Sequence, residues 1–287
     1  MSFLNKNYSD QPSLFKPIAI IVVILLIAGG AYTFFGKKFS NNTSNQAGEA
    51  ENQAGRVNPT GLDSSMKVSN AGDVEKVIAK WVEANPQAIL ESVANMQKKV
   101  MEEQSKNAQK TIGDKKDELF GKGSPSYSPS GYNITIVEFF DYSCGYCKKA
   151  QATVEELVKE DKKIRVIYKE FPILGQGSEE MSQVALAVNM IDSSSYKKFH
   201  DALMKSSARG KDAAIKVAKD IGINGDKLEA TLRDKKEKID EIIQANRALG
   251  ASIGINGTPG FVIGEELVPG ALELEAMKEK IKAARKK

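Results

Sequence analysis

A helical segment flanked by two runs of β-branched and aromatic residues constrains the fold of this chain more than any other sequence feature. The runs "ITIVEFFDY" (134–142) and "KIRVIYKEFPI" (163–173) are both typical of buried strands. Residues 144–161, "CGYCKKAQATVEELVKED", contain many good helix formers. Because parallel strands need a crossover connection of this kind, the two strands are predicted to pair in parallel.

The rest of the C-terminal region adds a helical insert and a second pair of strands. From about residue 176 to residue 254, apolar residues recur at helical spacing, with Ser, Gly and Asn-Gly breaks between the helices. Two short strands at 261–263 and 267–268 then flank a hairpin-like turn, and a final helix covers about 272–284. This order predicts an α/β domain over residues 121–287, with the helices inserted between its two halves.

A long apolar segment precedes this domain. Residues 17–36 follow a short leader, residues 1–16, and their apolar run is just long enough for a helix that crosses a bilayer. One interpretation is an uncleaved transmembrane anchor. The other is a signal peptide cleaved near the small residues 28–30. Because the apolar run resumes after residue 30, we favour the anchor, and either interpretation sends the remaining chain to a compartment where disulfides persist.

Two further regions lie between this segment and the α/β domain. Residues 37–66 are polar and predict a flexible linker, whereas 67–120 predict a helical stalk with a first helix beginning near Asp73. A second helix after Pro86 carries a short coiled-coil-like seam, formed by Ile89, Val93, Met96 and Val100. Because the seam covers only about two heptads, the sequence leaves two alternatives open for the stalk. The stalk either packs on its own chain or associates with a second copy.

The charge distribution does not favour a nucleic-acid partner. The formal net charge is +4, and much of the surplus lies between residues 278 and 287. There the basic residues alternate with apolar ones, which is typical of the solvated face of a last helix. Basic residues interleaved with aromatic ones on a surface would instead indicate nucleic-acid binding.

The chain has only two cysteines, Cys144 and Cys147, and they could serve metal binding, structure or redox chemistry. Structural zinc sites need four ligands, and the single histidine, His200, is distant in sequence, so no metal is predicted. A structural disulfide that closes so short a loop adds little stability.

Redox chemistry has a clear mechanism at this position. Cys144 is predicted at the junction of a strand and a helix, where the free amides of the first helical turn favour a thiolate. Cys147 lies one helical turn further on the same face. Cys144 is therefore the predicted nucleophile, Cys147 is its partner, and their disulfide is the only redox group expected, without a separate cofactor.

The Cys-Gly-Tyr-Cys motif, followed more than a hundred residues later by Thr258-Pro259, resembles the thioredoxin fold. With the helical insert, the chain is similar to the DsbA-type disulfide oxidoreductases. The segment "WVEANPQAILESV" in the predicted stalk resembles the stalked, ScsC-like and Com1-like branch of these proteins.

This resemblance implies roles for further residues. Thr258 and Pro259 match the cis-proline loop, which packs beside the reactive sulfur and pairs with an extended substrate. Glu138 matches a buried acid behind the second cysteine, which could relay the proton of Cys147, and Lys169 is its expected electrostatic neighbour.

The dipeptide between the cysteines departs from the strongest oxidants of the family. Gly145 and Tyr146 stand where those proteins have Pro-His, so the thiolate-stabilising histidine is missing. The resemblance therefore implies a less extreme oxidant, with Gly145 and Tyr146 on the substrate side of the site.

Three functions remain as alternatives at the level of sequence. The first is a thiol oxidase that acts on exported proteins with cysteines and is re-oxidised by a membrane partner. The second is a disulfide isomerase or reductase, for which an oligomeric stalk would present several active sites to one client. The third is a membrane-tethered chaperone or binding module. All three predict a periplasmic protein, either anchored in the inner membrane by residues 17–36 or released by cleavage.

Overall fold

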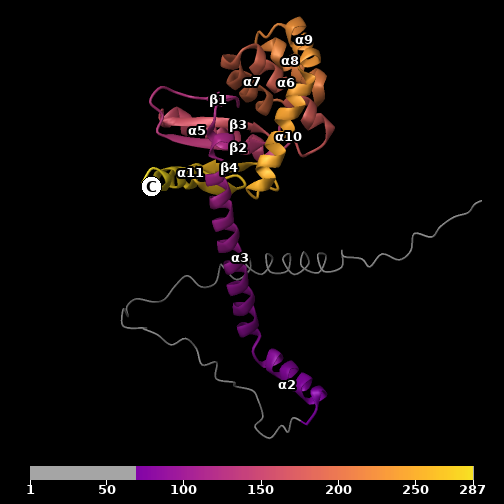
Figure 1. The fold of residues 1–287 in the computed structure, drawn as a ribbon, viewed down its shortest axis with the longest axis vertical. Helices are drawn as coiled ribbons and strands as arrows, with labels where there is room; N and C mark the ends of the chain where they lie inside the picture. Colours follow the sequence, from indigo (N-terminus) through magenta and orange to yellow (C-terminus); the bar gives the residue numbers. More distant parts are fainter. Residues whose placement is uncertain (1–68, 287) are drawn as a thin grey trace, which may run out of the picture. The chain divides into compact units, whose positions relative to one another are not determined.

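A computed structural model of the chain describes residues 69–286 (Figure 1). The predicted leader, membrane segment and linker, residues 1–16, 17–36 and 37–66, lie outside the described residues. Within the part that is described, none of the helices combines the length and the apolar character that a membrane crossing requires.

A five-stranded sheet forms the centre of the α/β domain, with the strand order β1-β3-β2-β4-β5. The central strands β2 and β3 pair in parallel, which confirms the sequence-based prediction. The other three pairs, β1 with β3, β2 with β4, and β4 with β5, are antiparallel. The strands are β1 (Ser126–Tyr127), β2 (Ile134–Phe140), β3 (Ile164–Glu170), β4 (Gly260–Ile263) and β5 (Glu266–Pro269).

Strand β1 was not predicted from the sequence. It lies in a Gly/Ser/Pro-rich stretch, and two residues are too few to show the alternation of a strand. Pairing with the edge of β3 defines it, through Ser126 opposite Ile167 and Tyr127 opposite Val166. This strand therefore depends on a tertiary contact.

The mixed α/β fold with a helical segment is confirmed. Helix α5 (Gly145–Glu160) connects β2 to β3, and five helices lie between β3 and β4. These five are α6 (Gln176–Ile191), α7 (Ser193–Lys205), α8 (Gly210–Asp220), α9 (Gly225–Asp234) and α10 (Lys236–Ser252). The last helix is α11 (Leu274–Ala284).

Within the described residues, three helices precede the sheet, namely α2 (Ala71–Ala84), α3 (Pro86–Asp114) and α4 (Lys116–Phe120). The first begins earlier than predicted, because the cap is Asn70 rather than Asp73. The Asn70 side chain accepts a hydrogen bond from the Asp73 backbone N–H at 3.1 Å. Pro86 occupies the first turn of α3, where its missing N–H costs no helical hydrogen bond.

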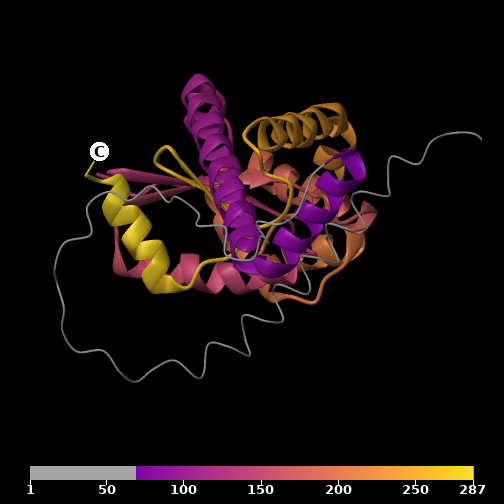
Figure 2. The ribbon, with the colours of Figure 1, turned by 90° about the horizontal axis from the view of Figure 1, so that it is seen from below.

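The sheet has a hydrophobic core on each face, because successive residues of a strand point to opposite sides. On one face, Ile136 and Phe140 of β2 pack with α5, α11 and the inserted helices. On the other face, Val137 and Phe139 pack with Ile112 of α3 and with residues of α4 and α10. Figures 1 and 2 show α11 and α10 on either side of the end of α3 that meets the sheet.

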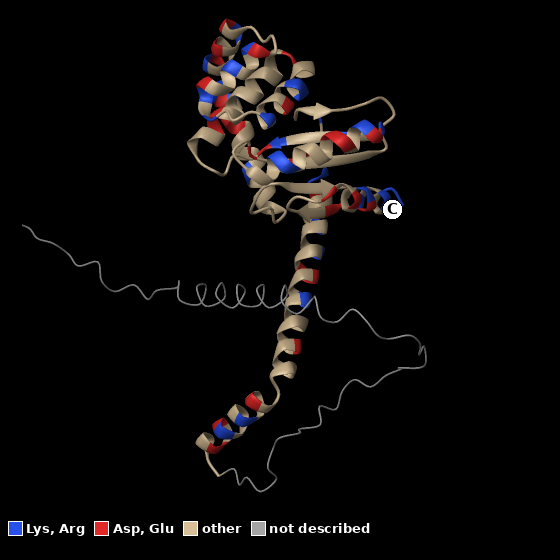
Figure 3. Ribbon diagram, turned by 180° about the vertical axis from the view of Figure 1, so that it is seen from behind, with Lys and Arg blue, Asp and Glu red and all other residues tan. Residues whose placement is uncertain are grey.

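Charged residues of both signs are interspersed on the surface helices. Figure 3 shows Lys and Arg alternating with Asp and Glu on the inserted helices and along α3. Several of them form ion pairs one helical turn apart, such as Lys197 with Asp201 at 2.5 Å and Lys216 with Asp220 at 3.2 Å.

Gly250 provides a test of the second core. A Cβ atom at this position of α10 would lie 2.7 Å from Cε2 of Phe171, whose ring packs edge-on against Phe139. Gly250→Ala is therefore expected to lower the free energy of unfolding by about 1–3 kcal/mol, measured by urea denaturation. The control is Gly113→Ala in α3, where no atom lies within 4 Å of the new Cβ. It should leave stability unchanged or slightly higher, and equal losses in both variants would contradict the packing argument.

Candidate active site

Cys144 and Cys147 lie at the start of α5, directly after β2, and both are free thiols. Cys144 is the N-cap of the helix, and the Cys147 backbone N–H donates to its Sγ at 3.4 Å. Cys147 is fully buried, whereas Cys144 keeps 7% of its surface exposed. The two cysteines are therefore inequivalent, because Cys144 retains a small exposed surface and Cys147 retains none.

The Thr258-Pro259 segment lies opposite Cys144, although it is distant in sequence. The peptide bond between these two residues is cis, and β4 begins directly after it. The Cys144 thiol donates to the Thr258 carbonyl oxygen at 3.3 Å. The carbonyl of Pro259 accepts from the Gly270 backbone N–H at 2.9 Å, which ties this segment to the end of β5.

Glu138 lies in the middle of β2 and is completely buried. Neither of its carboxyl oxygens has a hydrogen-bond partner among the described residues. Burial, and to a smaller extent the negative charge of Asp201, raises the pKa of Glu138 to about 8. Glu138 is therefore a neutral acid at pH 7, in contrast to an exposed glutamate.

The thiol of Cys147 is electrostatically coupled to Glu138. Burial is the main cause that raises the pKa of Cys147, and the charge of Glu138 raises it further. A hydrogen bond from the Asp141 backbone opposes this effect by stabilising the thiolate. The charge of Glu138 therefore acts on the pKa of the buried cysteine.

Lys169 is not the neighbour of Glu138, and this expectation was wrong. In the β2–β3 register Lys169 is opposite Phe139 and Glu138 is opposite Tyr168, so the two charged side chains lie on different faces of the sheet. The ammonium group of Lys169 donates to the Glu118 carbonyl at 2.7 Å and to the Ser124 hydroxyl at 2.8 Å. Burial lowers its pKa to about 8. Lys169 therefore fastens the end of α4 to β3, away from the cysteines.

The two residues between the cysteines face open space. Tyr146 is 71% exposed, and a Cβ at Gly145 would have no neighbour within 4 Å. Neither residue is therefore needed for packing of the described chain, and both are accessible to a molecule that approaches Cys144.

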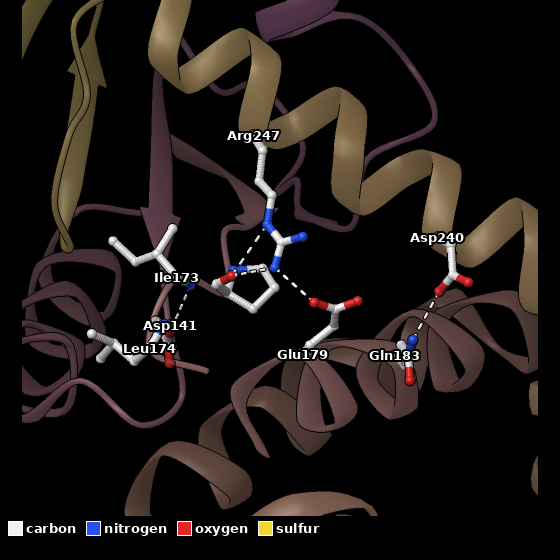
Figure 4. Close-up of polar contacts among 8 residues, drawn as sticks. Asp141, Ile173, Leu174, Glu179, Gln183, Asp240 and Arg247 are labelled. Atoms are coloured by element: carbon white, nitrogen blue, oxygen red, sulfur yellow. Dashed lines mark hydrogen bonds and ion pairs between the residues drawn. The ribbon is translucent and has the colours of Figure 1, made fainter. Parts of the chain in front are cut away.

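Asp141 is a site residue that sequence analysis missed. It is completely buried between β2 and the cysteine turn, and its carboxylate accepts three backbone hydrogen bonds. Figure 4 shows it beside Ile173 and Leu174, two of the three donors. The donors are Ser143 at 2.8 Å, Ile173 at 2.8 Å and Leu174 at 3.0 Å. The signal in the sequence is an aspartate directly after a strand, where its side chain can hydrogen-bond to the backbone two residues on.

A buried polar cluster lies beside the site, between β3 and α7. The carboxyl of Glu170 accepts from the Tyr196 hydroxyl at 2.6 Å and from the Tyr142 hydroxyl at 3.2 Å. Tyr142 also contacts Nδ1 of His200 at 3.2 Å, while Nε2 of His200 contacts Gln151 at 3.0 Å. Burial raises the pKa of Glu170 to about 8 and lowers the pKa of His200 to about 3. At neutral pH the cluster is thus a network of uncharged side chains that fastens α7 to the sheet.

No group of three or more His, Cys, Asp or Glu side chains that could hold a metal ion occurs among residues 69–286. His200 uses both ring nitrogens within the polar cluster.

The curated relatives that the chain matches are much longer proteins. One is the Na(+)/H(+) antiporter NhaA 1 of Salinispora arenicola, which is 23% identical over 153 residues. The match covers 53% of this chain and only 23% of that protein, so it concerns a segment and not the antiporter as a whole.

Two solved structures match nearly their whole length. The thiol-disulfide exchange protein α-DsbA2 of Wolbachia pipientis is 30% identical with a TM-score of 0.58, and the match covers 61% of this chain and 95% of that one. A thioredoxin-like oxidoreductase of Silicibacter pomeroyi DSS-3 is 35% identical with a TM-score of 0.56, and the match covers 60% and 98%.

A third similar structure extends further along this chain. ScsC of Proteus mirabilis, in a transitional conformation, has a TM-score of 0.51 over 76% of this chain and 99% of that one. At an identity of 23%, this match shows a similar fold.

The family comparison matches more than half of the chain. The matched residues, 135–282, begin in β2, end in α11 and include the two cysteines, the helical insert and Thr258-Pro259. The description of the matching family is DSBA-like thioredoxin domain. The chain therefore belongs to the family of DsbA-like thioredoxin domains.

Proposed function

We propose that the chain carries out thiol–disulfide exchange on exported proteins through Cys144 and Cys147. The observation that carries the proposal is the inequivalence of the two sulfurs. Cys144 keeps a small exposed surface at the N-terminus of α5, where backbone N–H groups favour negative charge, while Cys147 is fully buried behind it. This is the arrangement that a nucleophile and a resolving thiol require.

The exchange balances as two displacements at sulfur. In the oxidising direction, a substrate thiolate attacks Cys144 Sγ of the Cys144–Cys147 disulfide, the S–S bond breaks, and Cys147 leaves as a thiolate. A second substrate thiolate then attacks the substrate sulfur of the mixed disulfide, which forms the substrate disulfide and releases Cys144. The substrate loses two electrons and the protein gains them. In isomerisation, reduced Cys144 attacks a substrate disulfide and is later released without net redox change.

Glu138 can supply the proton that Cys147 needs on leaving. A thiolate in this buried position is unfavourable, because the pKa of Cys147 is raised. Neutral Glu138 would transfer its proton to the sulfur, become a carboxylate, and then recover a proton from solvent. The buried glutamate thus acts as a relay, without the lysine partner that was expected.

On the substrate side, Thr258 and Pro259 would bind the extended chain around the reacting cysteine. Their support is the contact between Cys144 and the Thr258 carbonyl. Gly145 and Tyr146 would form the opposite wall, since both are open to solvent.

Apolar residues exposed on α2 and α3 favour isomerase or reductase activity as the second candidate. A row of apolar side chains on these helices lacks a covering partner within residues 69–286, which suggests that a second copy covers it. An oligomer would present several Cys144 sulfurs to one misfolded client. The row consists of Val74, Ile78, Val82, Ile89, Leu90, Val93, Met96, Val100 and Met101.

The predicted export of the chain fits a periplasmic location, with residues 17–36 as an inner-membrane anchor or a cleaved signal. A membrane redox partner would then return Cys144 and Cys147 to the state that the activity needs. A chaperone module without redox function is the less favoured alternative, because it would not require an accessible and a buried thiol.

Substitution of each cysteine tests the assignment of roles. Cys144→Ser should abolish exchange in both the oxidation of reduced ribonuclease and the refolding of scrambled ribonuclease. Cys147→Ser should accumulate mixed disulfides through Cys144, because no resolving thiol remains, and gel electrophoresis without reductant would detect them. Full activity of Cys144→Ser would overturn the assignment.

Substitution of Glu138 tests the relay and its cost to stability. Because the folded-state pKa of about 8 exceeds the ordinary value of 4.5, Glu138 remains protonated in the folded chain while the unfolded chain ionises. The burial of Glu138 therefore makes the free energy of unfolding fall as the pH rises from about 4.5 to 8. The decline is at most about 1.4 kcal/mol per pH unit. Glu138→Gln should flatten this decline in urea denaturation and slow exchange. An unchanged pH profile together with an unchanged rate would contradict both roles.

Charge placed on the stalk tests the isomerase proposal. Val93→Lys with Met96→Lys should shift the sedimentation of the protein toward the monomer and reduce refolding of scrambled ribonuclease more than oxidation of reduced ribonuclease. Asn95→Lys is the matched control, since it adds charge to an exposed position of the same helix outside the seam. If both the double variant and the control sediment like the unsubstituted chain, self-association through this seam is wrong.

A further inference from the structure

Lys148 lies one helical turn from the reactive cysteine. It directly follows Cys147 in α5, and its backbone N–H donates to the Cys144 carbonyl oxygen at 3.1 Å. Residues four positions apart in a helix lie on the same face, with about 5–6 Å between their Cβ atoms. Lys148 and Cys144 are therefore neighbours at the start of α5.

The connection between α7 and α8 lies against this part of α5. The ammonium group of Lys148 donates to the carbonyl oxygen of Ser206, the first residue after α7, at 2.6 Å. The Ser206 hydroxyl donates to the Leu203 carbonyl at 2.8 Å and accepts from the Ala208 N–H at 3.1 Å. The connection is thus folded onto the end of α7, and Lys148 fastens it to α5.

A second set of contacts brings the same connection to the cysteine turn. A Cβ atom at Gly177 of α6 would lie 3.6 Å from the backbone nitrogen of Gly210, the first residue of α8. The next residue of α6, Ser178, donates from its hydroxyl to the Ser143 hydroxyl at 2.8 Å. Because Ser143 immediately precedes Cys144, the start of α8 and the cysteine turn share α6 as a neighbour.

Two cations meet at this place. Arg209 is the N-cap of α8 and has an exposed side chain, whereas the side chain of Lys148 is half-buried. Burial, and to a smaller extent the charge of Arg209, lowers the pKa of Lys148. Neither cation forms an ion pair with a carboxylate within residues 69–286. The fold therefore brings two like charges together without an anion.

Nearby cations on the same helices are neutralised. Lys149, the next residue of α5, pairs with Glu273 at 2.7 Å, and Lys205, at the end of α7, pairs with Glu155 at 2.7 Å. Two unneutralised cations in a partly buried position repel each other and raise the free energy of the protein alone. A carboxylate bound between them would remove this repulsion and accept charge-assisted hydrogen bonds from both. The pair is therefore complementary to an anionic group on a molecule that reaches Cys144.

We propose that Lys148 and Arg209 bind a carboxylate of the substrate polypeptide and so select substrates with an acidic side chain near the reacting cysteine. Because an extended chain advances about 3.3 Å per residue, the acidic residue lies within about two residues of that cysteine. The inference rests on the proposed exchange at Cys144 and adds a specificity determinant to it. Neither cation takes part in the displacements at sulfur.

Two peptides that each contain a pair of cysteines test the preference. They differ only beside each cysteine, where one peptide has glutamate and the other glutamine. The oxidised full chain is mixed with each reduced peptide, and the second-order rate constant for the loss of peptide thiols is measured. Hydroxyethyl disulfide, which carries no charge, gives the intrinsic glutamate-to-glutamine ratio of the peptides. The ratio with the protein should exceed the intrinsic ratio about twofold to fivefold at low salt, as for an exposed ion pair. At about 1 M salt the excess should disappear.

Charge reversal at Arg209 shows whether the preference comes from this pair. Arg209→Glu should lower the ratio to the intrinsic value or below it, because the new carboxylate pairs with Lys148 and repels that of the peptide. Lys198→Glu is the matched control, since it makes the same change in net charge. Lys198 is exposed, and its ammonium donates to the Ile221 carbonyl at 3.0 Å, beyond the opposite end of α8. This control should keep the ratio.

Neutralisation of Lys148 tests the second member of the pair. Lys148→Met keeps the length of the side chain and removes its charge, so it should also lower the ratio toward the intrinsic value. Urea denaturation checks that the variant is folded. Where it is not, Lys148→Gln, whose amide retains a hydrogen-bond donor for the Ser206 carbonyl, replaces it. A folded variant that keeps the full ratio would overturn the proposed role of Lys148.

The outcomes separate this inference from the proposed function. If the oxidised chain reacts with neither peptide, the exchange function fails, and the inference fails with it. If it reacts with both peptides at the intrinsic ratio, the exchange function stands and the carboxylate site is wrong. The site is equally wrong if Arg209→Glu and Lys198→Glu change the ratio by the same factor, because the effect would then come from net charge alone.

Discussion

The parallel pairing of β2 with β3 is the interaction on which the rest of the structure depends. Seven consecutive residues of β2 are in register with β3, from Ile134 opposite Ile164 to Phe140 opposite Glu170. The register sends alternate side chains to two separate cores, one beneath α5 and the inserted helices and one against α3 and α4. It also brings the carboxyl ends of both strands to the same edge of the sheet. The cysteine turn and the loop after β3 therefore meet there, and Asp141 can hydrogen-bond to both.

Buried acids distinguish this sheet from a purely apolar one. Glu138 and Glu170 come from adjacent strands and point to the same face, and burial raises the pKa of each to about 8. An isolated ionised carboxylate in such a position would cost several kcal/mol, so both groups are kept neutral near pH 7. Their surroundings differ, however. Tyrosine hydroxyls donate to one oxygen of Glu170 and thereby fasten α7 to β3, whereas neither oxygen of Glu138 has a hydrogen-bond partner within residues 69–286.

The helices before the sheet divide into a packed part and an exposed part. At the end of α3, Ala108 and Ile112 are buried, and Leu119 of α4 belongs to the core on the same face of the sheet as Phe139. Earlier in α3 and throughout α2, apolar side chains are exposed. The helices that sequence analysis treated as one stalk thus contribute both to the stability of the α/β domain and to a surface that a second copy could cover.

The sequence by itself determined the order of the elements and the position of the redox pair. The β-branched and aromatic runs of β2 and β3 and the helix formers of α5 are local features, so residue type and spacing were sufficient to predict the parallel pair and the cysteines at the start of a helix. The same patterns predicted the helical segment before β4. Burial of Glu138 could be inferred because its flanking residues are apolar.

Only the tertiary structure decided which side chains meet. The family resemblance implied Lys169 as the neighbour of Glu138, but the register places the two side chains on opposite faces of the sheet. Strand β1 and the hydrogen bonds from Ile173 and Leu174 to Asp141 were equally inaccessible, because each joins residues separated by more than thirty positions. Local patterns follow from the geometry of a single helix or strand. The contacts of the site depend instead on the register and on the loops that it brings together, and these are properties of the folded chain.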